Sequence, residues 1–213
     1  MHITDPRIES YCVTHSTPVD AVLAELERRT YLTQILPRML SGPWQARLLH
    51  LLVKMRAPAR VLEIGTFTGY SAIAMASALP EGGRLDTIEQ NEELEGVIRE
   101  FVDKAGLSDR IRLHIGDAFD VLDTLDSGFD FVFLDADKER YPDYLDVLVP
   151  MMTPGGVLIA DNVLWDGKVV GAEDDSDRQT RGIRRFNERV LAHPALENVI
   201  IPLRDGVNLI VKK

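Results

Sequence analysis

The sequence Phe129-Asp130-Phe131-Val132-Phe133-Leu134-Asp135-Ala136-Asp137-Lys138 is an apolar run that stops abruptly at acidic residues. The segment Val157-Leu158-Ile159-Ala160-Asp161-Asn162 has the same pattern, an apolar run followed by polar residues. Near-continuous apolar strands are typical of parallel sheets whose two faces are both covered by helices. We therefore predict two buried strands that end in polar side chains at one edge of a sheet, where ligands of α/β proteins bind.

Short apolar runs alternate with longer amphipathic stretches from residue 58 onward. This alternation predicts a mostly parallel sheet with helices on both faces. Near the end, a helical pattern over 180–192 precedes two β-rich runs joined by the turn signal Asp205-Gly206, which predicts an antiparallel pair. The fold class is thus α/β, with seven strands of which the last is reversed. The expected strands are 60–64, 84–89, 111–115, 129–134, 156–160, 197–202 and 207–211, and the helices between the first five are 70–79, 92–105, 119–125 and 141–151.

The first part of the chain is expected to be helical, because apolar residues recur at helical spacing over 19–29 and 45–52. With 213 residues, of which 45% are hydrophobic, one domain is the simplest organisation. We therefore expect residues 1–56 to form a helical segment of the same domain as a core over 57–213, on its acceptor and dimer side.

Composition argues against several classes of protein. The net charge of −10 counts against a general binder of nucleic acid or of an anionic membrane. The single cysteine, Cys12, has no intramolecular disulfide partner and forms no cysteine-based metal site. The start of the chain lacks the apolar core of a signal peptide, and no apolar run is long enough to span a membrane. We expect a cytoplasmic protein.

A glycine-rich turn, Glu63-Ile64-Gly65-Thr66-Phe67-Thr68-Gly69-Tyr70-Ser71, follows the first expected strand. Such a turn lets a ligand approach the backbone and offers it helix N-terminal amides; a tight turn without a ligand is the alternative. Phe67 stands where the dinucleotide-binding pattern has its second glycine, which favours a nucleoside without a pyrophosphate over NAD. Glu89 is placed to bind a ribose diol, or it is an ordinary exposed acid beside the cap residue Asn91. Asp117 either caps a helix or faces an adenine edge.

Oxygen-bearing side chains follow the fourth and fifth expected strands. Asp135, Asp161 and Asn162 supply the ligand atoms that Mg²⁺, Mn²⁺ or Ca²⁺ prefers. Two unrelated capping acids would give the same pattern. Lys138 lies one helical turn beyond Asp135 and is either a general base or an ordinary surface charge.

Three motifs, over 61–71, 129–138 and 155–165, resemble in this order those of the metal-dependent class I O-methyltransferases. These are the caffeoyl-CoA and catechol O-methyltransferase group, and the likeness runs from about Met39 to the C-terminus. The resemblance implies a Rossmann-like class I methyltransferase fold, S-adenosylmethionine (SAM) as methyl donor and a bound Mg²⁺, Mn²⁺ or Ca²⁺. It also implies cofactor-binding roles for Met39, Ser41, Glu63, Gly65, Thr66, Ser71, Glu89, Ala118 and Asp137.

The same resemblance makes Asp135, Asp161 and Asn162 the metal ligands, with Lys138 as the catalytic base beside Asp135. The acceptor pocket is expected to be walled by Trp165, Tyr141 and Asp166. Plant members commonly have an asparagine at the position of Asp166, and they carry a longer N-terminal arm. Both differences argue against the plant acceptor.

The favoured function is a metal-dependent O-methyltransferase that acts on a catechol-like vicinal diol. The alternative acceptor is hydroxylated uridine in tRNA, to which the arginines of 178–189 would present an anion-binding face rather than an ordinary exposed one. An NAD-dependent oxidoreductase and a SAM-sensing binding module are the alternatives from other classes. The family usually forms homodimers, here through the N-terminal helices. The acidic run 173–175 is expected to be a solvated loop or the charge at the start of a helix.

Overall fold

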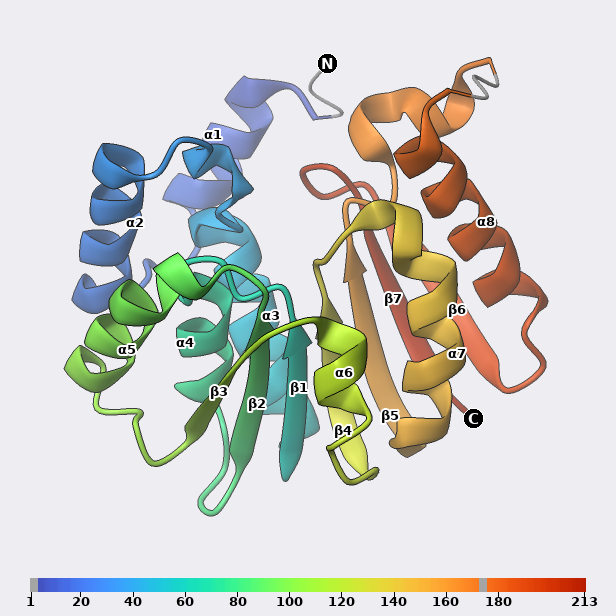
Figure 1. Cartoon of the computed structure of the whole chain (residues 1–213). Helices are drawn as coiled ribbons and strands as arrows, with labels where there is room; N and C mark the ends of the chain where they lie inside the picture. Colours follow the sequence, from blue (N-terminus) through green and yellow to red (C-terminus); the bar gives the residue numbers. More distant parts are fainter. Residues whose placement is uncertain (1–3, 173–175) are drawn as a thin grey trace. The chain divides into compact units, whose positions relative to one another are not determined.

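The computed structural model describes residues 4–172 and 176–213, so the acidic run expected at 173–175 lies outside the described residues (Figure 1). The chain forms two compact units, which are described in turn. The N-terminal unit is Ser10–Leu125, and the C-terminal unit is Asp126–Lys213 with the described residues of Met1–Glu9. The sequence-based boundary after residue 56 stays a prediction.

The N-terminal unit contains three parallel strands in the order β3-β2-β1. The central residues of β1 and β2 are buried, which agrees with the apolar runs that predicted these strands, whereas in β3 only Ile111 is buried. The strands are β1 (Arg60–Ile64), β2 (Arg84–Glu89) and β3 (Ile111–Ile115). The helices are α2 (Ala21–Thr33), η1 (Pro37–Met39), α3 (Gly42–Arg56), α4 (Tyr70–Ala76), η2 (Glu92–Leu94), α5 (Glu95–Lys104) and α6 (Ala118–Leu122), while α1 (Pro6–Thr14) precedes them.

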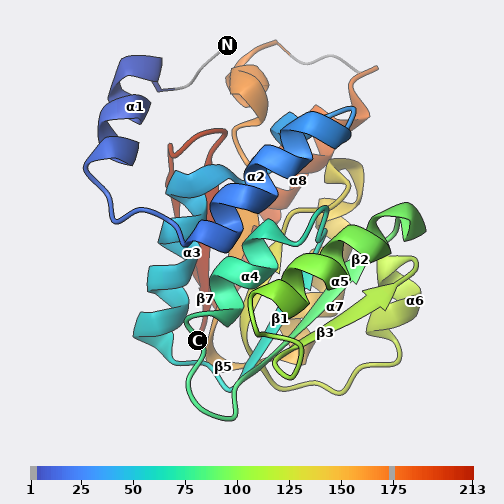
Figure 2. The same cartoon turned by 90° about the vertical axis from the view of Figure 1, so that its left-hand side faces the viewer.

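Helix α4 is the centre of this unit, because all seven of its residues are buried. It packs against α3 and α2, and α2 also contacts α5 (Figures 1 and 2). The helix begins after Gly69, whose φ of +92° is a left-handed conformation that L side chains rarely adopt. The glycine-rich turn after β1 therefore leads directly into a fully buried helix.

The C-terminal unit has four strands in the order β4-β5-β7-β6. Strands β4 and β5 are parallel, while β7 runs antiparallel to both β5 and β6. The reversed last strand predicted from the sequence is thereby confirmed. The strands are β4 (Phe129–Leu134), β5 (Met152–Asp161), β6 (Leu196–Ile201) and β7 (Val207–Lys212), with η3 (Lys138–Arg140), α7 (Tyr141–Met151), η4 (Trp165–Val170) and α8 (Arg178–Ala192) between them.

Strand β5 begins earlier than its apolar pattern indicates, at Met152 rather than at residue 156. The register with β4 shifts between Phe129 and Phe131, and Pro154 and Gly155 are exposed there. An irregular, exposed strand start carries no apolar signal, so only backbone pairing reveals it.

Helix α8 packs on α7 and on the short turn η3 (Figure 1). Gly182 makes the second contact possible, because an added Cβ would overlap the carbonyl oxygen of Lys138 and lie 2.8 Å from Cα of Glu139. In the described part of the chain, no helix is both long and apolar enough to cross a lipid bilayer.

Candidate active site

The glycine-rich turn of the N-terminal unit is held by polar side chains from the two neighbouring strands. Glu63 is fully buried near the end of β1 and accepts a hydrogen bond from the Thr87 hydroxyl of β2. The same hydroxyl bonds that of Thr66 in the turn. The predicted residues Glu63, Gly65 and Thr66 therefore lie on one supported piece of backbone.

Glu89 fixes the conformation of this turn from the end of β2. Its Oε2 accepts the backbone N–H of Phe67 at 2.7 Å, and its Oε1 accepts that of Asn91 at 2.8 Å. Phe67 has a φ of +51°, so the turn adopts a conformation that is uncommon for a non-glycine residue. Each carboxylate oxygen has a second lone pair, so Glu89 retains acceptor capacity for a ligand diol.

The other residues that are predicted to bind the cofactor lie in several different elements. Ser71 is buried in the first turn of α4, and Ser41 is buried just before α3. Met39 is 57% exposed at the end of η1. Ala118 begins α6, which Asp117 caps through the N–H of Phe119 at 2.9 Å, as one of its two interpretations predicted. Asp137 is an exposed residue of the C-terminal unit that caps η3.

In the C-terminal unit, Asp135 follows the last residue of β4, and Asp161 is the last residue of β5. Leu134 pairs with Ala160 in the parallel register, so both acids come one step further along adjacent strands. Lys138 is 6% exposed, and its ammonium lies 2.6 Å from Oδ1 of Asp135. Lys138 is therefore a buried ion-pair partner rather than an ordinary surface lysine.

Tyr141 holds Lys138 in place. Its hydroxyl accepts a hydrogen bond from Lys138 Nζ at 2.9 Å and lies 3.0 and 3.1 Å from the carbonyl oxygens of Leu134 and Asp161. Complete burial raises the pKa of Tyr141 well above its ordinary value, and the charges of Asp135 and Asp161 raise it further. The hydroxyl therefore stays protonated and connects the ends of two strands to Lys138. Through these contacts Tyr141 supports the side chain of Lys138. Its role in lining an acceptor pocket stays a prediction.

Asn162 follows Asp161 with a φ of +57°, and its backbone N–H bonds Oδ1 of Asp161 at 2.8 Å. Its side-chain Nδ2 donates to Oδ2 of Asp205 at 3.4 Å. The sequence assigned Asp205 only to a turn and gave no signal of this contact. Burial raises the pKa of Asp205, against the lowering effect of hydrogen bonds from the backbone of Asp166 and the side chain of Asn162.

The donor set at the ends of β4 and β5 fits a hard divalent cation. Asp135 and Asp161 offer carboxylate oxygens and Asn162 an amide oxygen, and the positive partner of Asp135 in this structure is an ammonium. Within residues 4–172 and 176–213, no group of three His, Cys, Asp or Glu side chains is arranged to hold a metal. The predicted set has two carboxylates and one amide, so the amide of Asn162 is essential to it.

The loop after Asn162 contains Trp165 and Asp166, whose role in an acceptor pocket stays a prediction. Both have left-handed backbone conformations, with φ of +46° and +52°. Such strain in non-glycine residues is commonly found at functional sites. The guanidinium of Arg184 braces this loop by donating to three backbone carbonyls. Among the described residues, the buried Nε1 of Trp165 has no hydrogen-bond partner. The indole N–H of the partly exposed Trp165 is thus a buried donor that an acceptor oxygen could satisfy.

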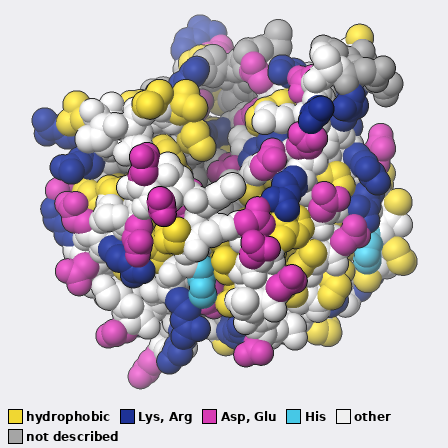
Figure 3. All heavy atoms as spheres, viewed as in Figure 1, with side chains coloured by type: hydrophobic (Ala, Val, Ile, Leu, Met, Phe, Trp, Pro, Cys, Tyr) yellow, Lys and Arg dark blue, Asp and Glu magenta, His cyan; other side chains and the backbone are white. Residues whose placement is uncertain are grey.

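The arginines of α8 do not form one free basic face. Arg184 binds the loop carbonyls, and Arg189 binds Asp146 and the carbonyl oxygen of Pro142. Arg178 is 3.7 Å from Glu139. Acidic and basic side chains are interspersed over the face shown in Figure 3. These contacts agree with the interpretation of the helix as an ordinary solvated face.

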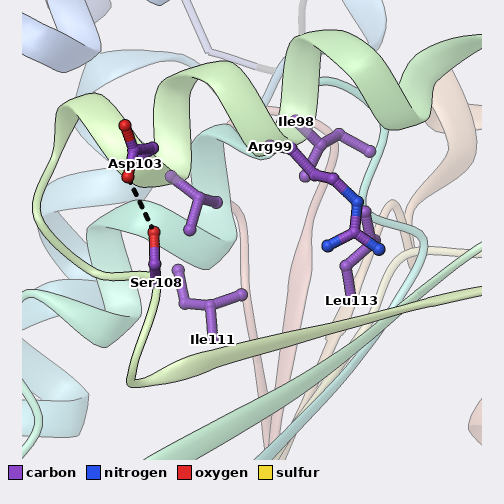
Figure 4. Close-up of a pocket in the computed structure, with 7 residues that line it drawn as sticks. Ile98, Arg99, Asp103, Ser108, Ile111 and Leu113 are labelled. Carbon is purple, nitrogen blue, oxygen red and sulfur yellow. Dashed lines mark hydrogen bonds between the residues drawn. The ribbon is translucent and has the colours of Figure 1, made fainter.

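A surface groove of about 240 Å³ lies elsewhere in the N-terminal unit, beside α5 and β3 (Figure 4). Apolar side chains dominate its lining, and a hydrogen bond of 3.3 Å joins Ser108 to Asp103. The groove contains none of the predicted site residues. Its lining is Ile98, Arg99, Val102, Asp103, Ser108, Ile111 and Leu113.

Comparison with known proteins identifies the family of this chain. Residues 13–213 match the model of the O-methyltransferase family. The chain is 36% identical over 187 residues to a catechol O-methyltransferase of Niastella koreensis, covering 84% of each protein. It is 35% identical over 175 residues to a caffeoyl-CoA O-methyltransferase of Eucalyptus globulus, covering 78% of this chain and 71% of the relative. The chain belongs to the O-methyltransferase family, as the sequence motifs predicted.

Solved structures agree with this assignment. An O-methyltransferase from Bacillus cereus in complex with SAH has a TM-score of 0.90 and 33% identity, covering 97% of both chains. The O-methyltransferase TomG from Streptomyces achromogenes, in complex with SAM, has a TM-score of 0.90 and 32% identity, covering 97% of this chain and 96% of its own. The predicted fold, a class I methyltransferase with a mostly parallel seven-stranded sheet and a reversed last strand, is confirmed.

Proposed function

We propose that this O-methyltransferase transfers the methyl group of SAM to a hydroxyl of a small, catechol-like vicinal diol with the help of a divalent cation. One observation carries the proposal: the buried Lys138 is paired with Asp135 at the end of β4, one strand away from Asp161 and Asn162. This arrangement supports a proposed proton acceptor next to oxygen atoms of the kind that a hard cation prefers. It matches the chemistry of deprotonating and methylating a hydroxyl.

SAM is the proposed methyl donor because structural neighbours carry SAM or its product in their crystal structures. In this chain, Glu89 stabilises the glycine-rich turn and keeps lone pairs for a ribose diol. Phe67 stands where the close approach of a pyrophosphate needs a glycine, which argues against the NAD alternative. The remaining proposed cofactor contacts are Met39, Ser41, Glu63, Gly65, Thr66, Ser71, Ala118 and Asp137.

Asp135, Asp161 and Asn162 would hold the cation, with Mg²⁺ as first choice and Mn²⁺ or Ca²⁺ as alternatives. When bound, such a cation supplies positive charge that lowers the pKa of an acceptor hydroxyl and fixes its orientation. Lys138 Nζ, after releasing one of its own protons to solvent, takes the proton of that hydroxyl. The oxygen then forms a bond to the sulfonium methyl carbon as the C–S bond breaks, which leaves SAH as the product. Tyr141 keeps Nζ in position throughout.

A small phenolic acceptor is favoured over tRNA. Relatives of this chain bear the names catechol O-methyltransferase and caffeoyl-CoA O-methyltransferase. The arginines of α8 that would face an RNA are largely engaged with their own protein. The unpartnered Trp165 Nε1 supports a polar aromatic acceptor, whose oxygen it would bind, and Asp166 lies beside it.

We further propose a cytoplasmic homodimer that uses the N-terminal helices. Leu51 and Met55 support this assembly, because they are exposed apolar residues four positions apart on α3. Light scattering after size exclusion tests it: a single species of twice the 23.9 kDa chain mass is expected, and a monomer at micromolar concentration contradicts it.

The function is tested by methyl transfer from labelled SAM to caffeate and to unfractionated tRNA, each with Mg²⁺ and with EDTA. We expect labelled caffeate with Mg²⁺ and none with EDTA. Label in tRNA alone would refute the small-molecule acceptor. Turnover of caffeate that persists in EDTA would refute the metal. The variant Asp161→Ala should lose both metal binding and turnover, while Asp109→Ala, an exposed turn residue, should keep both.

A further inference from the structure

We infer that Asp205 is a positioning residue of the proposed metal site, which fixes the amide of Asn162 and the backbone loop around it. The inference rests on the proposed metal ligands and assigns a role to a residue outside them. Asp205 lies in the turn that joins β6 to β7, far along the chain from Asp161 and Asn162. Only tertiary structure brings the turn and the loop together.

Four hydrogen bonds connect this turn to the loop that follows β5. The backbone N–H groups of Val163 and Leu164 donate to the carbonyl oxygens of Gly206 and Asp205, at 3.1 and 3.0 Å. The two carboxylate oxygens of Asp205 accept the backbone N–H of Asp166 and the side-chain Nδ2 of Asn162. Asp205 alone therefore makes three of the four connections.

The contact with Asn162 decides which end of the amide is available. An ionised carboxylate only accepts hydrogen bonds, so Asp205 selects the NH₂ end of the amide and repels its oxygen. Oδ1 of Asn162 is thereby directed to the other side, as a cation ligand must be. Residues that orient a metal ligand commonly change metal affinity by about 10–100-fold when they are removed.

The other contacts stabilise strained backbone. Asn162, Trp165 and Asp166 all have positive φ, a backbone conformation that is unfavourable for residues other than glycine. Asp205 compensates by accepting hydrogen bonds from this backbone: its carboxylate accepts the N–H of Asp166, and its carbonyl oxygen accepts the N–H of Leu164. Gly206 permits the close approach, because a Cβ there would overlap the side chain of Leu164.

The test measures Mn²⁺ affinity of the full chain in the presence of SAH by electron paramagnetic resonance. Relative to wild type, Asp205→Ala should bind Mn²⁺ about 10–100-fold more weakly. Asp205→Asn keeps one accepting oxygen, so its Mn²⁺ affinity should fall less than that of Asp205→Ala. The control Asp109→Ala should match wild type, and SAH affinity, measured by calorimetry, should stay unchanged in all three variants.

Two results would overturn the inference while leaving the proposed metal intact. One is wild-type Mn²⁺ affinity in Asp205→Ala. The other is a parallel loss of SAH and Mn²⁺ binding with a lowered melting temperature, which would indicate general disruption. Absence of Mn²⁺ binding to the wild type would instead refute the metal itself, and the inference with it. Asp161→Ala separates these cases. If the wild type binds Mn²⁺ and Asp161→Ala does not, the proposed metal site exists, and either of the first two results then refutes only the role of Asp205.

Discussion

Lys138 and Asp135 form a buried ion pair, with 2.6 Å between Nζ and Oδ1, at the point where β4 ends. The two residues are three positions apart, and Lys138 is the first residue of the short turn η3. Because Asp135 is also a proposed metal ligand, the pair couples the proposed base to the proposed cation site. Several predictions about activity depend on this pair and its neighbours.

Replacing Lys138 should remove the proton acceptor without disturbing the cofactor turn, which belongs to the other unit. We expect Lys138→Ala to lower kcat for caffeate by about 10²–10⁴-fold, the usual contribution of a general base. The affinity for SAH should change little. Steady-state kinetics and calorimetry measure the two quantities. Equal turnover of the variant and wild type near neutral pH would remove Lys138 from the mechanism.

Tyr141→Phe should loosen Lys138, because the hydroxyl that accepts from Nζ and reaches two strand ends is lost. A buried hydrogen-bond loss of this kind costs about 1–3 kcal/mol of stability. We expect a lower melting temperature and a lower kcat with little change in KM for SAM. Tyr144→Phe is the matched control on the same helix, and its kcat should equal that of the wild type. Wild-type kcat in Tyr141→Phe would contradict the supporting role.

Gly182→Ala should push α8 away from the turn that carries Lys138, because the new Cβ overlaps backbone atoms of Lys138 and Glu139. Overpacking of this kind costs about 1–3 kcal/mol. Gly96→Ala is the control: outside the backbone of its own helix and its chain neighbours, no described atom lies within 4 Å of the added Cβ, so about 0.4–1 kcal/mol of stabilisation is expected. Chemical denaturation measures both. A Gly182→Ala protein as stable as Gly96→Ala would show that the contact is easily relieved.

Glu89→Gln should weaken SAH binding, since it replaces a carboxylate that both accepts from Phe67 and is proposed to bind the ribose. Hydrogen bonds to charged groups are worth about 1.5–3 kcal/mol, which corresponds to about 10–150-fold in affinity. The exposed Glu93→Gln is the control and should bind SAH like wild type. Calorimetric affinities decide the matter, and equal values for the two variants would refute the assignment.

Trp165→Phe should raise KM for the acceptor and leave KM for SAM unchanged, because it removes the unpartnered indole donor while it keeps an aromatic ring. One neutral hydrogen bond is worth about 0.5–1.5 kcal/mol, or about 2–12-fold in KM. Trp44→Phe on α3 is the control. If KM for SAM rises instead, Trp165 belongs to the cofactor side of the site.

The element pattern was largely readable from the sequence. The bounds of β1 to β4 and of α7 match their predicted ranges, because buried parallel strands and an amphipathic helix have distinctive apolar spacing. The exposed start of β5 escaped prediction, since its pairing depends on backbone contacts rather than on side-chain type. The extent of α2 and α3 was also underestimated, because only part of each helix carries the apolar pattern.

The family, the fold class and the acids at the ends of β4 and β5 are predictable from the sequence, because each of these follows from residue type and local order. The partners of these residues are visible only in the folded chain. The buried hydroxyl of Tyr141, the contact of Gly182 with η3 and the turn of Asp205 against Asn162 all join segments separated along the chain. Local patterns describe a residue's own segment, whereas hydrogen bonds and close packing between segments exist only after the chain has folded.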